Sequence, residues 1–170
     1  FVGLFRNGEF ILPRGDTGIE AGDRAVVIGS PESVQSFAIA VASDATPDEA
    51  DEIVIIGGSE IGYQTALLLE ERDLGARLIE HDHDRARWLA EHLPGTVVMH
   101  HDETDTDFLA REHVDQADIV VTALESDERN LLVSVLAKRL GVDRVVSVVD
   151  SMEYVTVFEE IGIDVAINPR

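Results

Sequence analysis

The sequence contains no cysteine, which excludes disulfide bonds and every metal or catalytic site that depends on a thiolate. It also contains no apolar run of roughly 18 residues, the length that a membrane-spanning helix needs. Two motifs of hydrolases are missing, the G-x-S-x-G nucleophile turn and the H-E-x-x-H metal-binding helix. The sequence therefore presents no set of catalytic residues, and a non-catalytic binding function is the first expectation.

Basic residues are scarce, and lysine is almost absent. The 170 residues include 34 acidic and 13 basic side chains, which gives a formal net charge of −21 at pH 7, and Lys138 is the only lysine. A surface of this charge repels a phosphate backbone, so nucleic acid is not an expected partner. In multi-molar salt, charges more than about 3 Å apart are screened from one another. The composition therefore predicts a protein from the salt-rich cytoplasm of a halophile.

What the sequence does contain is a strand, a glycine turn and a helix in direct succession. Residues 53–56 are only Ile and Val, which indicates a strand buried on both faces. The turn that follows reads Gly57, Gly58, Ser59, Glu60, Ile61 and Gly62, and a helix is expected from Glu60 to about Arg72. The unpaired N–H groups and the positive dipole end of such a helix favour an anion such as phosphate.

This turn matches the dinucleotide-binding fingerprint G-x-G-x-x-G at its first and last glycines, whereas Ser59 occupies the middle position. In that fingerprint, Gly57 would permit the tight turn and Gly62 would let the helix pack close to the strand. Glu80 ends the next expected strand, near the usual offset of about 20 residues for the acid that binds the ribose hydroxyls. Two interpretations remain open: a nucleotide-binding turn with Glu80 at the ribose, or a turn that binds no nucleotide.

Histidines gather after the second and third expected strands. They are His81, His83, His100 and His101. With Asp82 and Asp102 they could hold a divalent metal, but polar loop residues over an adenine pocket are the preferred interpretation, and no metal site is predicted. Arg85 and Arg87 follow on the next helix and could indicate a 2′-phosphate site, but salt bridges with the nearby Asp82 and Asp84 are the preferred interpretation. Trp88 is expected in the core.

Strands and helices alternate regularly after residue 52. Strands are expected at 53–56, 77–80, 96–99, 118–122, 144–148 and 164–167. Helices are expected at 60–72, 83–92, 105–113, 127–140 and 152–161. This alternation predicts an α/β fold, a Rossmann-type doubly wound parallel sheet with right-handed crossovers. Its six strands are expected in the order 3-2-1-4-5-6.

The residues before this sheet form a smaller α+β piece. Strands are expected at 1–5, 9–12 and 24–28, and a helix is expected from 31 to about 42. Residues 43–51 are polar and contain a proline, which is typical of a linker. The expected domains are therefore 1–42 and 52–170, joined by the linker 43–51. Because Phe1 lies inside a strand-like run, the chain is expected to be a fragment of a longer protein.

Together these features resemble the RCK domains, the regulators of potassium conductance, which are also called KTN or TrkA-N domains. The matching stretches are Ile55–Gly58, Ile61–Tyr63, Leu78–Glu80, Asp102–Asp105, Ala117–Asp118, Glu125–Asn130, Ala137–Gly141 and Gly162–Arg170. Residues 1–42 are similar to the closing half of a TrkA-C subdomain, through Arg6–Glu9, Pro13–Asp16 and Ala21–Arg24. The resemblance covers nearly the whole chain.

The resemblance implies a cytoplasmic nucleotide-sensing regulatory subunit of a Trk-type potassium uptake system, held at the inner face of the membrane by its transporter partner. It implies binding of NAD(H), or of an adenine nucleotide such as ATP, ADP or AMP, and assembly into homo-oligomers. It assigns nucleotide contacts to Gly57–Gly62, to Glu80 and His81, and to Asp102 and Glu103. For Asp102 two interpretations stay open: a place near the adenine, or a helix cap or solvated acid. The open alternatives are a fragment of an NAD-dependent dehydrogenase and a nucleotide-free scaffold that only assembles rings.

Overall fold

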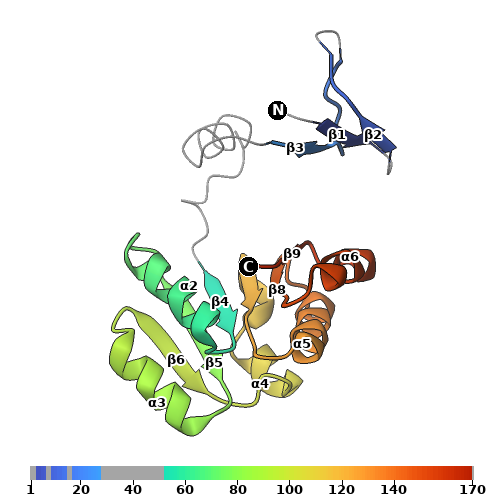
Figure 1. Cartoon of the computed structure of the whole chain (residues 1–170). Helices are drawn as coiled ribbons and strands as arrows, with labels where there is room; N and C mark the ends of the chain where they lie inside the picture. Colours follow the sequence, from blue (N-terminus) through green and yellow to red (C-terminus); the bar gives the residue numbers. More distant parts are fainter. Residues whose placement is uncertain (1–2, 7–8, 15–16, 28–51, 170) are drawn as a thin grey trace. The chain divides into compact units, whose positions relative to one another are not determined.

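The computed structural model describes residues 3–6, 9–14, 17–27 and 52–169. The chain divides into two compact units, Phe1–Pro47 and Asp48–Arg170 (Figure 1). The helix expected from residue 31 and the linker expected at 43–51 lie outside the described residues, so both stay predictions.

The first unit holds a three-stranded antiparallel sheet in the order β2-β1-β3. Its strands are β1 (Gly3–Arg6), β2 (Glu9–Ile11) and β3 (Arg24–Val26), so the expected hairpin and third strand are present. Arg6 fixes the loop before β3, because its guanidinium donates to both carboxylate oxygens of Asp23 at 2.7 Å and to the Gly18 carbonyl at 2.9 Å. The hydrogen bonds from Arg6 lower the pKa of Asp23 to about 2. Ionic contacts thus hold this loop in place.

The second unit is built on a six-stranded sheet in which every pair of neighbouring strands is parallel. The strands are β4 (Ile53–Ile56), β5 (Ala76–Glu80), β6 (Thr96–His100), β7 (Ile119–Thr122), β8 (Arg144–Val148) and β9 (Val165–Ile167). Their spatial order is β6-β5-β4-β7-β8-β9. This is the predicted 3-2-1-4-5-6 order, so the topological switch falls between β4 and β7, where ligands of such sheets bind.

The helices of this unit begin and end close to the predicted positions. They are α2 (Glu60–Glu70), α3 (His83–His92), α4 (Thr106–Arg111), α5 (Asp127–Leu140) and α6 (Met152–Ile161). The largest difference is at α4, which was expected to reach residue 113. It ends earlier because His113 has a left-handed backbone with φ of 53°, and a short 3-10 turn, Val114–Gln116, follows. Among the described residues, no helix is long and apolar enough to cross a membrane.

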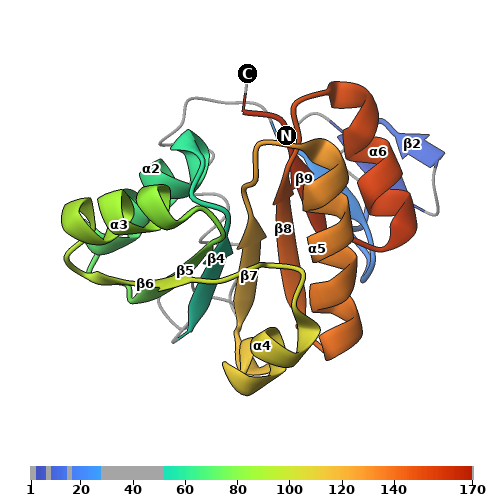
Figure 2. The same cartoon turned by 90° about the horizontal axis from the view of Figure 1, so that it is seen from below.

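Alternate residues of the central strand β4 face two separate apolar clusters. Ile55 packs with residues of α2 and α3, including Ala66 and Leu89. Val54 and Ile56 belong to a second cluster on the opposite face, with residues of α4, α5 and α6. Figure 2 shows α2 and α3 beside β4 to β6, and α5 and α6 beside β8 and β9. Helices therefore cover both faces of the sheet and leave its carboxyl edge open.

Candidate functional site

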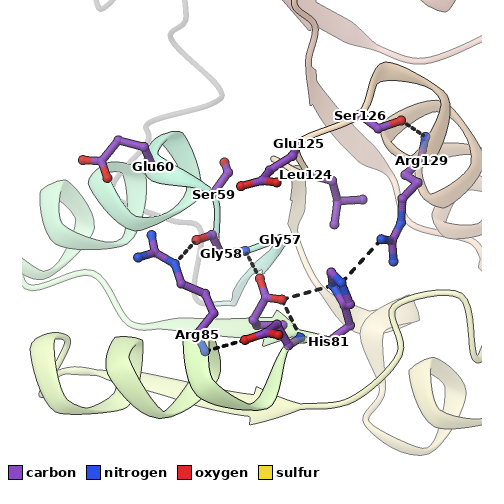
Figure 3. Close-up of a pocket in the computed structure, with 12 residues that line it drawn as sticks. Gly57, Gly58, Ser59, Glu60, His81, Arg85, Leu124, Glu125, Ser126 and Arg129 are labelled. Carbon is purple, nitrogen blue, oxygen red and sulfur yellow. Dashed lines mark hydrogen bonds and ion pairs between the residues drawn. The ribbon is translucent and has the colours of Figure 1, made fainter.

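A cavity of about 790 Å³ opens at the carboxyl edge of the sheet, beside the switch between β4 and β7. Its walls come from the turn after β4, the end of β5, the start of α3 and the loop after β7 (Figure 3). The lining residues are Gly57, Gly58, Ser59, Glu60, Glu80, His81, Asp82, Arg85, Leu124, Glu125, Ser126 and Arg129. Six of the residues predicted for nucleotide contacts thus meet at one cavity.

The glycines of the turn are required by close backbone contacts. Gly57 has a φ of 107°, and a Cβ atom there would lie 2.5 Å from the Ala123 carbonyl oxygen of the loop after β7. A Cβ on Gly62 would lie 2.1 Å from the Gly57 carbonyl oxygen, so no larger residue fits between α2 and the turn. The roles expected of these glycines, a tight turn and close helix–strand packing, agree with this geometry.

Ser59, which replaces the usual middle glycine, begins helix α2. Its hydroxyl accepts a hydrogen bond from the Gly62 N–H at 3.3 Å, and its carbonyl accepts one from Tyr63 N–H at 2.9 Å. Serine is among the residues that cap helix N-termini best. Serine in place of glycine therefore leaves less room for a phosphate at this position but caps the start of α2. The other N–H groups of the first turn have no partner within the helix and remain available to a ligand.

Glu80 is buried at the end of β5, with only 6% of its surface exposed. One carboxylate oxygen accepts a hydrogen bond from the Gly58 N–H, and the other accepts one from the Asp82 N–H, both at 2.7 Å. The His81 ring lies 3.0 Å from the second oxygen. Because each carboxylate oxygen can accept two hydrogen bonds, Glu80 can hold the glycine turn and still accept from a ligand hydroxyl.

Arg85 contacts the turn rather than an acid of its own helix, so the expected salt bridge is corrected. Its guanidinium donates from Nε to the Gly58 carbonyl at 2.6 Å and lies 4.5 Å above the Trp88 ring. The neighbouring Asp82 instead caps α3 through the Arg85 backbone N–H at 2.7 Å. Trp88 was expected in the core. It is partly buried and packs against Tyr63 at the margin of the α2–α3 cluster. Arg85 thus forms one wall of the cavity.

A buried acid, Glu103, contacts two residues of the cavity wall, Arg129 and His81. Glu103 is completely buried, and the Arg129 guanidinium donates a hydrogen bond to its Oε1. The His81 ring joins both, with Nδ1 at 3.6 Å from Glu103 Oε2 and Nε2 at 3.5 Å from Arg129 Nη1. Glu103 therefore stands behind the cavity wall and orients the two residues, Arg129 and His81, that line it.

The other predicted contact residues lie outside this cavity. Asp102 is exposed and accepts hydrogen bonds from the Thr104 backbone N–H and hydroxyl at 2.9 and 2.7 Å, and these bonds lower the pKa of Asp102. Ile61 lines a smaller neighbouring cavity. Gly62 lies beneath the turn, where it packs α2 against Gly57.

Sequence reasoning did not assign the loop after β7 to the site. Leu124, Glu125 and Arg129 of this loop and the helix after it line the cavity. Asn130, which is only 1% exposed, positions the loop because its side-chain oxygen accepts from Leu124 N–H and its amide donates to Val148 O. The available signal was the position of the loop, since the carboxyl ends of parallel strands share one edge.

The histidines do not come together around a common point. In the described parts of the chain, no group of three or more His, Cys, Asp or Glu side chains is arranged to hold a metal ion. His83 packs edge-on against His100, with ring centroids 5.2 Å apart. His101 stacks on Phe108 and lies 2.8 Å from an Asp105 carboxylate oxygen. Of the four, His81 alone is among the cavity residues.

The sequence profile of the TrkA-N domain family matches residues 53–169, the whole described sheet of the second unit. The chain belongs to the TrkA-N family. The profile of the TrkA-C domain matches residues 1–38 of this TrkA-N chain, as the resemblance of the first unit implied.

Three curated relatives of this TrkA-N chain are named Trk system potassium uptake protein TrkA or its homolog. The Archaeoglobus fulgidus homolog is 38% identical over 167 residues, which are 98% of this chain and 37% of that protein. The Halomonas elongata protein is 34% identical over 169 residues, 98% of this chain and 36% of the relative. The Haemophilus influenzae protein is 31% identical over 169 residues, which are 99% of this chain and 36% of that protein. The chain thus spans little more than a third of these relatives.

Solved structures share the fold of this TrkA-N chain. The GsuK channel superimposes with a TM-score of 0.66 at 20% identity over 98% of this chain and 29% of that one. The GsuK channel bound to NAD superimposes with a TM-score of 0.62 at 19% identity, over 79% of this chain and 27% of that one. GsuK bound to ADP superimposes with a TM-score of 0.63 at 21% identity, over 79% of this chain and 37% of that one. At these identities the similarity shows the fold alone, and it confirms the predicted Rossmann-type class.

Proposed function

We propose that this TrkA-N chain is a nucleotide-sensing regulatory module of a Trk-type potassium uptake system, with NAD(H) as its ligand and ATP, ADP or AMP as the alternatives. The cavity at the switch between β4 and β7 is the binding site. The module is non-catalytic and acts in the cytoplasm, at the inner face of the membrane, through a membrane potassium transporter. The intact protein forms homo-oligomers.

The observation that carries the proposal is the glycine turn with Glu80 bonded to it. The start of α2 directs N–H groups that the helix itself cannot bond toward the cavity, which suits a pyrophosphate. Glu80 stands at the end of the neighbouring strand, 2.7 Å from the Gly58 N–H. A carboxylate in this position accepts hydrogen bonds from the ribose hydroxyls of a dinucleotide. His81 and Arg85 then flank the adenosine half.

The regulatory role rests on the relatives. Proteins 31–38% identical to 98–99% of this chain are named for potassium uptake and not for a reaction, which supports a non-catalytic part in transport. A solved channel with the same fold was obtained with NAD and with ADP, which supports both ligand classes. The physical logic is a population shift: the nucleotide binds one arrangement of the module better than another and biases the transporter by that difference.

A thermal-shift panel of NADH, NAD⁺, NADPH, ATP, ADP and AMP in high KCl tests the proposal. A ligand at 100 times its Kd stabilises the folded chain by about 2.7 kcal/mol, which is a shift of roughly 5–10 °C for a domain of this size. At least one nucleotide should produce such a shift. If none does, the nucleotide-free scaffold is the better interpretation.

Two matched variants locate the binding. Ser59→Asp keeps a capping oxygen at the start of α2 but adds a negative charge where the pyrophosphate would lie. It should abolish the shift. Ser151→Asp makes the same exchange at the N-cap of α6, outside this cavity, and should retain a shift. Equal shifts in both variants would place the nucleotide elsewhere.

A further inference from the structure

A second cavity of about 260 Å³ adjoins the first at the turn after β4. It is lined by Ser59, Glu60, Ile61, Leu124, Glu125, Asp127, Asn130, Val148 and Asp150. Four of these residues, Ser59, Glu60, Leu124 and Glu125, also line the larger cavity. The two cavities therefore adjoin at the glycine turn, where a ligand with its phosphates on the turn would have one cavity on each side.

The two cavities differ in charge. The larger one is lined by acids and also by Arg85 and Arg129. The smaller one is lined by acids and by no basic residue. Glu60 lies in the first turn of α2, Asp127 lies in the first turn of α5, and Glu125 lies on the loop between β7 and α5. Their full negative charges outweigh the partial positive charges of the two helix starts.

Two acids that line the smaller cavity are hydrogen-bonded to uncharged groups. Glu60 accepts a hydrogen bond from the neutral Gln64 amide at 2.9 Å. Asp127 accepts one from the Asp150 backbone N–H at 2.8 Å. Both partners are uncharged groups, so neither carboxylate is neutralised by them. In Figure 3 the Glu125 side chain extends from its loop on the side of the turn that carries Ser59.

We propose that this second cavity selects a positively charged group, and that the whole site therefore prefers NAD⁺ to NADH and to ATP. The proposal rests on the proposed nucleotide function and names its ligand more closely. The ring of oxidised nicotinamide carries a positive charge that the reduced, neutral ring lacks. With the pyrophosphate on the turn, the nicotinamide half enters the acidic cavity. The γ-phosphate of ATP would enter the same space and meet the same carboxylates, which repel it.

Titration calorimetry of the chain with NAD⁺, NADH, ADP-ribose and ATP with equimolar Mg²⁺ measures the selectivity. NAD⁺ should bind about tenfold tighter than NADH, a gap of about 1.4 kcal/mol. ADP-ribose, which lacks the ring, should also bind more weakly than NAD⁺. The ratio should fall as KCl is raised, because part of the attraction acts through solvent-exposed charges. Equal affinities for NAD⁺ and NADH would overturn the inference.

The double variant Glu60→Gln/Glu125→Gln tests the named residues. Both side chains are exposed, so the fold should tolerate the change. The preference for NAD⁺ over NADH should fall below threefold, and ATP should bind at least threefold tighter than to the wild type. The matched control is Asp115→Asn, an exposed acid of the 3-10 turn before β7, at the opposite edge of the sheet. It should leave every affinity within twofold.

Two failures can be told apart. An unchanged preference in the double variant would overturn the assignment of the acids while nucleotide binding itself stands. Binding of none of the four ligands would overturn the proposed function and this inference together.

Discussion

Glu80, the last residue of β5, and Glu103, in the loop after the neighbouring strand β6, are two buried carboxylates that are stabilised in different ways. Glu80 is 6% exposed, and both of its oxygens accept backbone N–H groups at 2.7 Å. Glu103 is completely buried, and a cation, Arg129, donates to one of its oxygens. Its other oxygen, Oε2, accepts no hydrogen bond from any described residue. Glu80 thus accepts hydrogen bonds at both oxygens from the backbone, whereas Glu103 depends on the side chain of Arg129, 26 residues further along the chain.

The two acids therefore have different roles. Glu80 lines the cavity and keeps acceptor capacity for a ligand, so we expect it to act on nucleotide affinity as well as on stability. Glu103 stands behind the cavity wall and holds Arg129, which belongs to the first turns of α5. We therefore expect Glu103 and Arg129 to act on the free energy of unfolding, because a buried charge without its partner is strongly destabilising.

The largest expected effect comes from Arg129→Met. The change removes the counter-charge of Glu103, and breaking a buried pair typically costs about 3–5 kcal/mol. Arg129 is 42% exposed on its side chain, so water replaces part of the loss and about 2–4 kcal/mol is expected here. Urea unfolding measures it. Arg87→Met, at an exposed position of α3, is the control and should cost about 0.5 kcal/mol or less.

The double variant Arg129→Met/Glu103→Leu sharpens this prediction. Removing both charges should recover most of the lost stability, because replacing a buried ion pair by apolar residues is often neutral. If the double variant is as unstable as Arg129→Met, the loss of stability in the single variant does not come from an unpaired charge on Glu103.

Glu80→Gln should have the next largest effect on stability. The amide oxygen can still accept one backbone N–H, but the amide nitrogen faces the other donor, so one charge-assisted hydrogen bond is lost and one donor is unsatisfied. The expected loss is about 1–3 kcal/mol in urea unfolding. Glu91→Gln, on the exposed side of α3, should stay within about 0.5 kcal/mol of the wild type. A Glu80→Gln protein that is as stable as the wild type would contradict the account of Glu80 as the carboxylate that binds the Gly58 and Asp82 N–H groups.

Salt should act more strongly on the surface charges than on the pair of Glu103 and Arg129, in which the carboxylate is completely buried. With a net charge of −21, the chain repels itself, and raising KCl screens that repulsion. The melting temperature should therefore rise between 0.1 and 3 M KCl, by several degrees. The stability difference between wild type and Arg129→Met should stay nearly constant over the same range. A flat melting temperature would argue against a halophilic protein.

The smallest expected effect is a change in stability with pH that depends on Asp105. Hydrogen bonding to His101 and to the Phe108 N–H lowers the pKa of Asp105, the N-cap of α4. A carboxyl with a lowered folded pKa stabilises the fold above its unfolded pKa of about 3.9, and this contribution is lost as the pH falls through the folded pKa. The urea midpoint of Asp105→Asn should thus lie below that of the wild type at pH 6. The difference should shrink at pH 2.5, and a constant difference would contradict this.

The sequence was sufficient where local pattern and position decide the structure. The alternation of strands and helices gave the sheet order, and Gly57 and Gly62 marked the turn because only glycine fits their contacts. The pairing of Glu103 with Arg129, 26 residues away, has no local signal, and the family resemblance had implied a ligand contact for Glu103 instead. Arg85 was misjudged for the same reason, since its partner, the Gly58 carbonyl, is 27 residues distant.

Paired titration calorimetry of NADH and NADPH with the wild type and Glu80→Gln tests the central claim, that Glu80 and the glycine turn form a ribose–pyrophosphate site. A carboxylate and a 2′-phosphate about 4 Å apart repel by roughly 1 kcal/mol in water and about 4 at an effective dielectric constant of 20. The wild type should therefore bind NADH at least about tenfold tighter than NADPH, and Glu80→Gln should bind NADH more weakly and narrow that gap. Equal binding of NADH and NADPH by the wild type would contradict the account.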